Sequence, residues 1–207
     1  MSFLTHTLCD CGEGHVGGGQ VGQLADGGVP AAELGEIADK HPEFCRFIDL
    51  THVGHEAGVL VIDGGVDRLL GKSGKERLLA ESLAQTFDTT FFNTRKKVVQ
   101  NKHGRRNNCY ADFQQDGDIP NGKPTVVDFE SAPEMKKLRE TLPGFFGKWA
   151  EGLVAETNLY TDVSSAKVGI GFHGDSERRK VVGVRLGAAS TPSDSSGTIA
   201  ACPSPRR

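Results

Sequence analysis

His173 and Asp175 are the residues whose types and spacing point most directly to chemistry. They follow residues 167–172, where apolar and small residues alternate as they do in a β-strand. Side chains two positions apart on a strand point to the same side, so this imidazole and this carboxylate can bind one metal ion. They match two of the three protein ligands in the 2-His-1-carboxylate arrangement of non-haem Fe(II). The sequence therefore predicts part of an iron site.

A second pair, Asn158 and Tyr160, precedes the first and has the same spacing. Both residues fall in a strand expected over residues 153–161, so their side chains share one side of it. Asn-x-Tyr followed by His-x-Asp resembles the AlkB-like branch of the Fe(II)/2-oxoglutarate dioxygenases. The resemblance covers residues 155–187 well and extends more weakly upstream to about residue 58.

The resemblance implies a role for each of these residues. His173 and Asp175 would be ligands of Fe(II), and Asn158 and Tyr160 would hydrogen-bond the carboxylates of 2-oxoglutarate. Glu177 has the same parity as the ligands and would orient a ligand or contact substrate. The implied reaction is oxidative hydroxylation, which removes an N-alkyl group from a nucleic-acid base as an aldehyde. The implied fold is α+β: an incomplete double-stranded β-helix (jelly roll) with N-terminal helices and strands packed on it.

Two parts of the family pattern have no counterpart in this sequence. The family's second histidine and an arginine that pairs with 2-oxoglutarate come from later strands, but no histidine follows His173. Five arginines come later in the chain than His173, but none of them follows a second histidine. We therefore expect weak turnover or none from this chain. The arginines concerned are Arg178, Arg179, Arg185, Arg206 and Arg207.

The expected organisation has three regions. Residues 1–56 form a Gly-rich N-terminal extension with a short helix, and residues 57–190 form the partial dioxygenase domain. Residues 191–207 are rich in Ser, Pro, Gly and Ala. This composition is typical of a disordered tail. It is also compatible with a segment translated out of frame, in which another frame encodes the next strand of the jelly roll.

A basic segment lies at residues 95–106, where six Lys and Arg occur in a chain of net charge −3. Together with asparagine donors and a nearby tyrosine, it suits phosphate contacts and base stacking. One alternative is an exposed, charged hairpin. Another is that the whole chain is a non-enzymatic nucleic-acid-binding or structural protein that uses this segment. The predicted substrate-binding residues here are Lys97, Lys102, Arg105, Arg106 and Tyr110.

Hydrophobic periodicity and helix-capping signals predict the secondary structure. Ser73 and Glu76 have the spacing of a capping box at the start of a helix. Helices are expected over residues 30–40, 73–84, 133–142 and 144–151, and extended segments over 44–50, 58–62, 91–100, 125–129, 153–161, 167–173 and 180–186.

Cysteine usage and hydropathy bear on where the protein works. The five cysteines are odd in number and irregularly spaced, which favours reduced thiols in the cytoplasm or nucleus over a disulfide framework. The N-terminus lacks the pattern of a secretory signal, and the longest apolar stretch, residues 57–62, is too short to span a membrane.

A glycine motif at residues 17–22 lacks the preceding strand that a dinucleotide site requires. Two Cys/His groupings fit no common zinc spacing.

Overall fold

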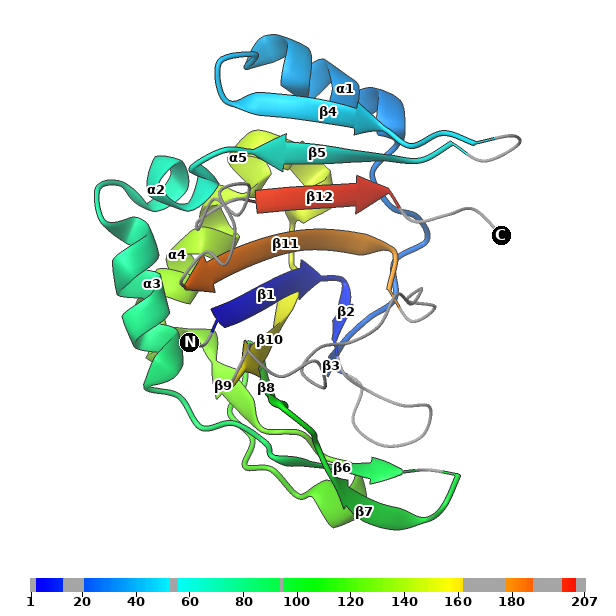
Figure 1. The fold of residues 1–207 in the computed structure, drawn as a ribbon, viewed down its shortest axis with the longest axis vertical. Helices are drawn as coiled ribbons and strands as arrows, with labels where there is room; N and C mark the ends of the chain where they lie inside the picture. Colours follow the sequence, from blue (N-terminus) through cyan, green and yellow to red (C-terminus); the bar gives the residue numbers. More distant parts are fainter. Residues whose placement is uncertain are drawn as a thin grey trace.

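The computed structural model describes residues 3–12, 21–52, 56–93, 95–161, 178–187 and 199–203. In this part of the chain one eight-stranded sheet dominates, with the order β4-β5-β12-β11-β1-β10-β8-β9 (Figure 1). Neighbouring strands pair antiparallel except β8 and β9, which are parallel. The strands are β1 (Phe3–Cys9), β4 (Cys45–Asp49), β5 (Gly58–Ile62), β8 (Arg105–Ala111), β9 (Val126–Asp128), β10 (Val154–Tyr160), β11 (Lys180–Gly187) and β12 (Ile199–Pro203).

Two small hairpins accompany this sheet. One pairs β2 (Cys11–Gly12) with β3 (Val21–Gly22), and the other pairs β6 (Thr90–Asn93) with β7 (Val98–Asn101). The β6–β7 hairpin projects beyond the β8 end of the sheet (Figure 1). Asp88 anchors its base, because the buried carboxylate accepts hydrogen bonds from the Thr125 backbone N–H at 2.8 Å and hydroxyl at 2.7 Å.

The helices pack against one side of the sheet. Side chains of β1 alternate, so Leu4, His6 and Leu8 point into the same core as the helices, and we call this side the helix face. Leu34, Leu78 and Leu138 are fully buried in that core. The helices are α1 (Ala31–Lys40), α2 (Gly65–Leu70), α3 (Gly74–Leu83), α4 (Pro133–Thr141) and α5 (Pro143–Phe146), with short 3-10 turns η1 (Ile119–Asn121), η2 (Phe129–Ser131) and η3 (Gly147–Ala150).

One histidine lies within this apolar core. His6 Nδ1 is 2.7 Å from the Thr157 hydroxyl, and its Nε2 is 3.2 Å from the Ser82 hydroxyl. The Ser82 hydroxyl donates to the Leu78 carbonyl, so Nε2–H donates to Ser82 and Nδ1 accepts from Thr157. Burial lowers the pKa of His6 to about 3. The imidazole is therefore neutral at physiological pH and holds β1, β10 and α3 together.

The structure confirms the α+β class and most of the expected elements. The helices expected over residues 30–40, 73–84 and 133–142 are present, as are the strands expected over 44–50, 58–62, 125–129, 153–161 and 180–186. Residues 144–151 form the end of α5 and η3, and residues 91–100 form most of a hairpin. The capping box is wrong, because Ser73 adopts φ 58° and makes no side-chain cap bond. The strand expected over 167–173 lies outside the described residues.

The main sheet combines strands from all three of the expected regions. β1, which comes from the supposed extension of residues 1–56, lies between β11 and β10. Two strands of this range, β1 and β4, therefore share the sheet with strands from later in the chain. β12 comes from the region expected to be a disordered or out-of-frame tail, and it pairs with β5 and β11. No helix in the described ranges is both long enough and apolar enough to cross a membrane.

Candidate functional site

The side of the sheet away from the helices carries polar residues in successive rows across β8, β10, β1 and β11. Residues directly opposite each other on paired strands share a side of the sheet, so the pairing register defines these rows. We call this side the polar face. Its first row is Arg105, Tyr160, Phe3 and Gly187, its second is Asn107, Asn158, Thr5 and Arg185, and its third is Cys109, Glu156, Thr7 and Gly183.

A chain of side-chain hydrogen bonds runs across the polar face. Arg105 Nη1 donates to Asn158 Oδ1 at 3.0 Å, and Asn158 Nδ2 donates to Glu156 Oε1 at 3.2 Å. Arg178 Nη2 then donates to Glu156 Oε2 at 3.1 Å. Asn158, Glu156 and Arg178 are all buried. The chain therefore fixes the positions of two guanidinium groups, a carboxylate and an amide.

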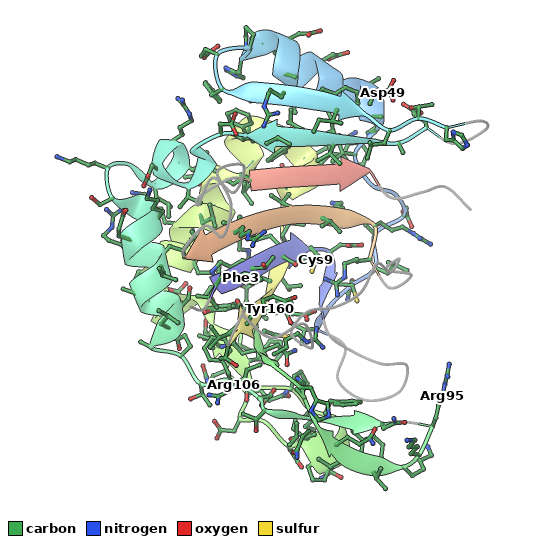
Figure 2. The ribbon with its side chains drawn as sticks, in the orientation of Figure 1. Phe3, Cys9, Asp49, Arg95, Arg106 and Tyr160 are labelled. Carbon is green, nitrogen blue, oxygen red and sulfur yellow. The ribbon has the colours of Figure 1, made fainter. Side chains whose placement is uncertain are left out.

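An aromatic stack lies beside this chain. The rings of Phe3 and Tyr160 are 4.5 Å apart and nearly parallel, and Arg185 Cζ lies 4.4 Å from the centroid of the Phe3 ring (Figure 2). Burial raises the pKa of Tyr160 above its ordinary value, and the positive charges of Arg105 and Arg185 partly oppose this. Both guanidinium groups therefore act on the Tyr160 hydroxyl, which keeps its proton at neutral pH.

Asp10 fixes the start of β11. Its carboxylate accepts hydrogen bonds from the backbone N–H groups of Arg179 and Lys180 at 3.0 Å and of Ala25 at 2.7 Å. A carboxylate held by several N–H groups is a rigid anchor. Because Arg178 directly precedes this anchored backbone, Asp10 also sets the position from which Arg178 reaches Glu156.

The polar face becomes apolar toward the β2–β3 hairpin. There a small hydrophobic cluster closes the sheet, and burial raises the pKa of the Cys9 thiol to about 12. A thiol with so high a pKa is a poor nucleophile. This end of the face is therefore structural. The cluster consists of Cys9, Val21, Cys109, Ala111, Val126 and Val154.

Asn158 and Tyr160 lie where the sequence places them. Both side chains are on the polar face of β10, which confirms that they share a side. The other predicted residues of this site, His173, Asp175 and Glu177, lie outside the described residues. Arg178 is the first described residue after them, and it points onto the polar face.

The basic segment is not one continuous surface. Lys97 is exposed in the β6–β7 turn, and Lys102 bonds the Asn107 side chain. Arg105 and Arg106 are successive residues of β8, so the first lies on the polar face and the second is exposed on the other side. In Figure 2, Arg95 at the hairpin tip points away from the sheet, far from Arg106.

Tyr110 is a correction to the predicted substrate-binding set. The side chain is fully buried on the helix face, with its ring 6.4 Å from His6 and 6.0 Å from Phe129. A ring enclosed in the core cannot stack on a base. Tyr110 comes five residues after Arg105 on one strand, so it faces the opposite side.

Glu156 and Arg178 are parts of the site that the sequence did not predict. The Arg178 side chain is buried against Glu156. One signal was available, because Glu156 is two residues before Asn158 and so shares its side of the strand. Within the described ranges, no three His, Cys, Asp or Glu residues gather as a metal site.

Comparison with known proteins gives one informative match. No protein-family model and no solved structure matches the chain. A curated protein of Acanthamoeba polyphaga mimivirus, named "Uncharacterized protein R156", is 31% identical over 196 residues, which is 89% of this chain and 74% of the viral protein.

Proposed function

The chain belongs to the same family as this mimivirus protein, and we propose that it is an AlkB-like Fe(II)/2-oxoglutarate dioxygenase acting on a nucleic-acid base or a related substrate. The main supporting observation is the placement of Asn158 and Tyr160. They lie side by side on the polar face of β10, between Arg105 and Arg185. Amide, phenol and guanidinium donors together suit the carboxylate oxygens of 2-oxoglutarate.

The proposed fold is an incomplete double-stranded β-helix. The eight-stranded sheet would be one of its two layers, and its polar face would point toward the second layer. Two features support this: the sheet is open, ending at β4 and β9, and the helices cover its other side. A charged, hydrogen-bonded sheet face opposite a helical layer is a suitable wall for a polar active site.

His173 and Asp175 are the proposed iron ligands. The segment that carries them connects Tyr160 to Arg178, and both of these residues lie on the polar face. Bound Fe(II) and 2-oxoglutarate would supply the oxidising chemistry for C–H hydroxylation. The chain's own residues would hold the co-substrate and orient it. The described part of that task falls to the Arg105–Asn158–Glu156–Arg178 chain.

Turnover by this chain is proposed to be impaired. The sequence offers no histidine after His173, so His173 and Asp175 leave the iron one protein ligand short of the usual three. Weak succinate formation from 2-oxoglutarate is the expected result. Robust, Fe(II)-dependent succinate formation would contradict the impairment.

Metal binding tests the proposal without requiring turnover. Calorimetric titration with Mn(II), a redox-stable probe, should show one binding site. His173→Ala and Asp175→Ala should each weaken the affinity for Mn(II) by more than about tenfold, because even residues that only contact a metal ligand can change metal affinity by that factor. His52→Gln is the matched control, because His52 is exposed and lies outside the motif. If both motif variants bind Mn(II) with the affinity of the unmodified chain, the proposed iron site is wrong.

A second candidate is a nucleic-acid-binding protein that needs no metal. The exposed tip of the β6–β7 hairpin favours it, because Arg95, Lys96 and Lys97 stand beside Val98 and Val99, which are 46% and 42% exposed. Changing the three basic residues to Gln should reduce the slope of log K against log salt by about 2–3 for a single-stranded oligonucleotide. A Lys72→Gln/Lys75→Gln variant is the charge control. Binding that persists with chelator and in His173→Ala would favour this candidate.

A further inference from the structure

We propose that two copies of this chain form a reversible dimer by pairing their β4 strands antiparallel, with Ile48 of each copy at the two-fold axis. β4 lies at the edge of the main sheet, several strands away from the polar rows on β8, β10, β1 and β11. The pairing requires neither iron nor co-substrate, so it stands apart from the proposed function.

The two edges of the main sheet differ in how their backbone groups are used. At β9, Val126 exchanges hydrogen bonds of 3.0 and 2.9 Å with Gln115, and the Asp128 N–H donates to the Gln114 side chain at 3.0 Å. At the other edge, β4 pairs with no strand except β5 among the described residues (Figure 1). An edge strand with unused N–H and C=O groups is a template for a further strand.

Hydrogen bonds at the ends of the β4–β5 ladder show which backbone groups point outward. The Phe44 carbonyl accepts from the residue after β5 at 2.9 Å, and the Leu50 N–H donates to the residue before β5 at 3.0 Å. Even-numbered residues therefore bond toward β5. Because this direction alternates along a strand, Phe47 and Asp49 direct their N–H and C=O groups away from β5.

The outward groups available to a partner form a short segment. Before it, the Cys45 N–H already donates to the His41 carbonyl at 2.8 Å. After it, the Thr51 N–H donates to the Asp49 carboxylate at 2.8 Å. Within the described residues, this leaves the backbone N–H and C=O groups of Phe47 and Asp49 for another strand.

A second copy of β4 fits this segment best in one register. With Ile48 opposite Ile48 of the second copy, each Phe47 faces Asp49 of the other copy, and the two residues exchange both of their N–H···O=C bonds. A shift toward Cys45 places the Asp49 carbonyl opposite an N–H that already donates to His41. The opposite shift brings the two Asp49 carboxylates together, which is unfavourable.

This register also covers exposed apolar side chains. Phe47 packs against the main core beneath α1, so the neighbouring Ile48 points to the other side of the sheet. Ile48 is 41% exposed, and Leu50, at 56%, is the most exposed large apolar residue described. In the pairing, the two Ile48 side chains meet at a Cα separation of about 4.5 Å, and Leu50 lies against the aliphatic stem of Arg46 from the other copy.

The charges of β4 do not oppose the pairing. Arg46 forms an exposed ion pair with Asp63 of its own copy, and the two Arg46 side chains lie at opposite ends of the paired segment. β4 also has none of the lysines and prolines that protect many natural edge strands. Because the segment is much shorter than the about 20–30 residues per side of a standard interface, the dimer should depend on concentration.

Sedimentation velocity of the full chain over an about hundredfold concentration range, with chelator present, tests the inference. The unmodified chain should shift from monomer to dimer as its concentration rises. Ile48→Lys should weaken the dimer by about tenfold or more, because two ammonium groups would meet at the axis. Leu83→Lys is the matched control, since Leu83 is 48% exposed at the end of α3, and it should leave the dimer unchanged. Urea unfolding checks that both variants fold.

A mixing experiment tests the register. Ile48→Lys and Ile48→Glu should each be mainly monomeric, whereas their equimolar mixture should form a heterodimer, because position 48 lies opposite itself and the charges then attract. A chain that stays monomeric over the whole range overturns the pairing, whatever other strand β4 binds. A dimer that Ile48→Lys leaves intact uses another surface and overturns it too, as does a mixture that stays monomeric.

Discussion

The two faces of the central sheet are built from the same strands, but their buried polar groups differ in charge. On the helix face, Leu4 and Leu8 flank His6, whose burial lowers its pKa to about 3, so the imidazole is neutral. On the polar face, Glu156 and Arg178 are also buried and form an ion pair at 3.1 Å. The buried histidine of the helix face is neutral, whereas the buried ion pair of the polar face stays charged.

This difference has an energetic meaning. Desolvating two charges costs several kcal/mol, and the attraction within a buried pair often only offsets that cost. Replacing a buried ion pair by apolar residues of similar volume is often neutral or stabilising. The charges of the polar face are therefore better explained by ligand binding than by folding, which agrees with the co-substrate binding proposed for this face.

Arg178→Met should have the largest effect on stability. It leaves the Glu156 carboxylate buried without its partner, and breaking such a pair costs about 3–5 kcal/mol. Equilibrium urea unfolding measures the change. Leu24→Ala is the control, because Leu24 is 46% exposed and should change the free energy of unfolding by no more than about 0.5 kcal/mol.

The double variant Glu156→Leu/Arg178→Met sharpens the comparison. If the pair exists for binding, replacing both partners should restore most of the stability that Arg178→Met loses, because no unpaired charge remains. The same double variant should still lose affinity for 2-oxoglutarate, because Asn158 loses its acceptor in Glu156. A double variant as unstable as the single one would show that the pair supports the fold in another way.

His6→Gln tests the neutral state on the helix face. The pKa of His6 is about 3 in the folded chain and about 6.5 when unfolded, so the unfolded chain takes up a proton as pH falls below 6.5. The contribution of neutral His6 to the free energy of unfolding is complete above pH 6.5 and decreases as the pH falls toward 3. Between pH 7 and pH 5 the unmodified chain should lose about 2 kcal/mol that His6→Gln does not.

Urea unfolding at pH 7, 6 and 5 measures this difference. His52→Gln, at an exposed position, should keep the pH dependence of the unmodified chain. Parallel pH profiles for His6→Gln and the unmodified chain would mean that the imidazole is not held neutral. The buried group of the helix face would then not be neutral, and the difference in charge between the two faces would not hold.

Local patterns predicted the elements that bury apolar residues at regular spacing. α1 and β5 were predicted because Leu34 and Ala38 repeat at helical spacing and three of the five residues of β5 are β-branched. β8 was missed because it carries polar side chains on both faces. Its Asn107 and Asn108 are buried, since Lys102 and the Thr86 carbonyl supply hydrogen bonds. Hydrophobic alternation does not detect such a strand.

The site was predictable only where its residues share one strand. Asn158 and Tyr160 follow from strand parity, and the same rule extends to Glu156. Arg178 does not follow from it, because its burial depends on Glu156, which lies 22 residues earlier in the chain. The pairing of β10 and β11 with β1 brings them together, and no local pattern encodes that pairing.

Phe3→Leu should have the smallest effect on stability and tests how the polar face holds Tyr160. The variant removes the ring between Tyr160 and Arg185 and should cost about 1 kcal/mol, the usual size of an aromatic pair. Phe113→Leu, at a 45% exposed position, is the control and should be nearly neutral in urea unfolding. Without the ring, Tyr160 loses its stacking partner, so 2-oxoglutarate binding should weaken while Mn(II) binding stays unchanged. Unchanged 2-oxoglutarate affinity would show that other residues position Tyr160.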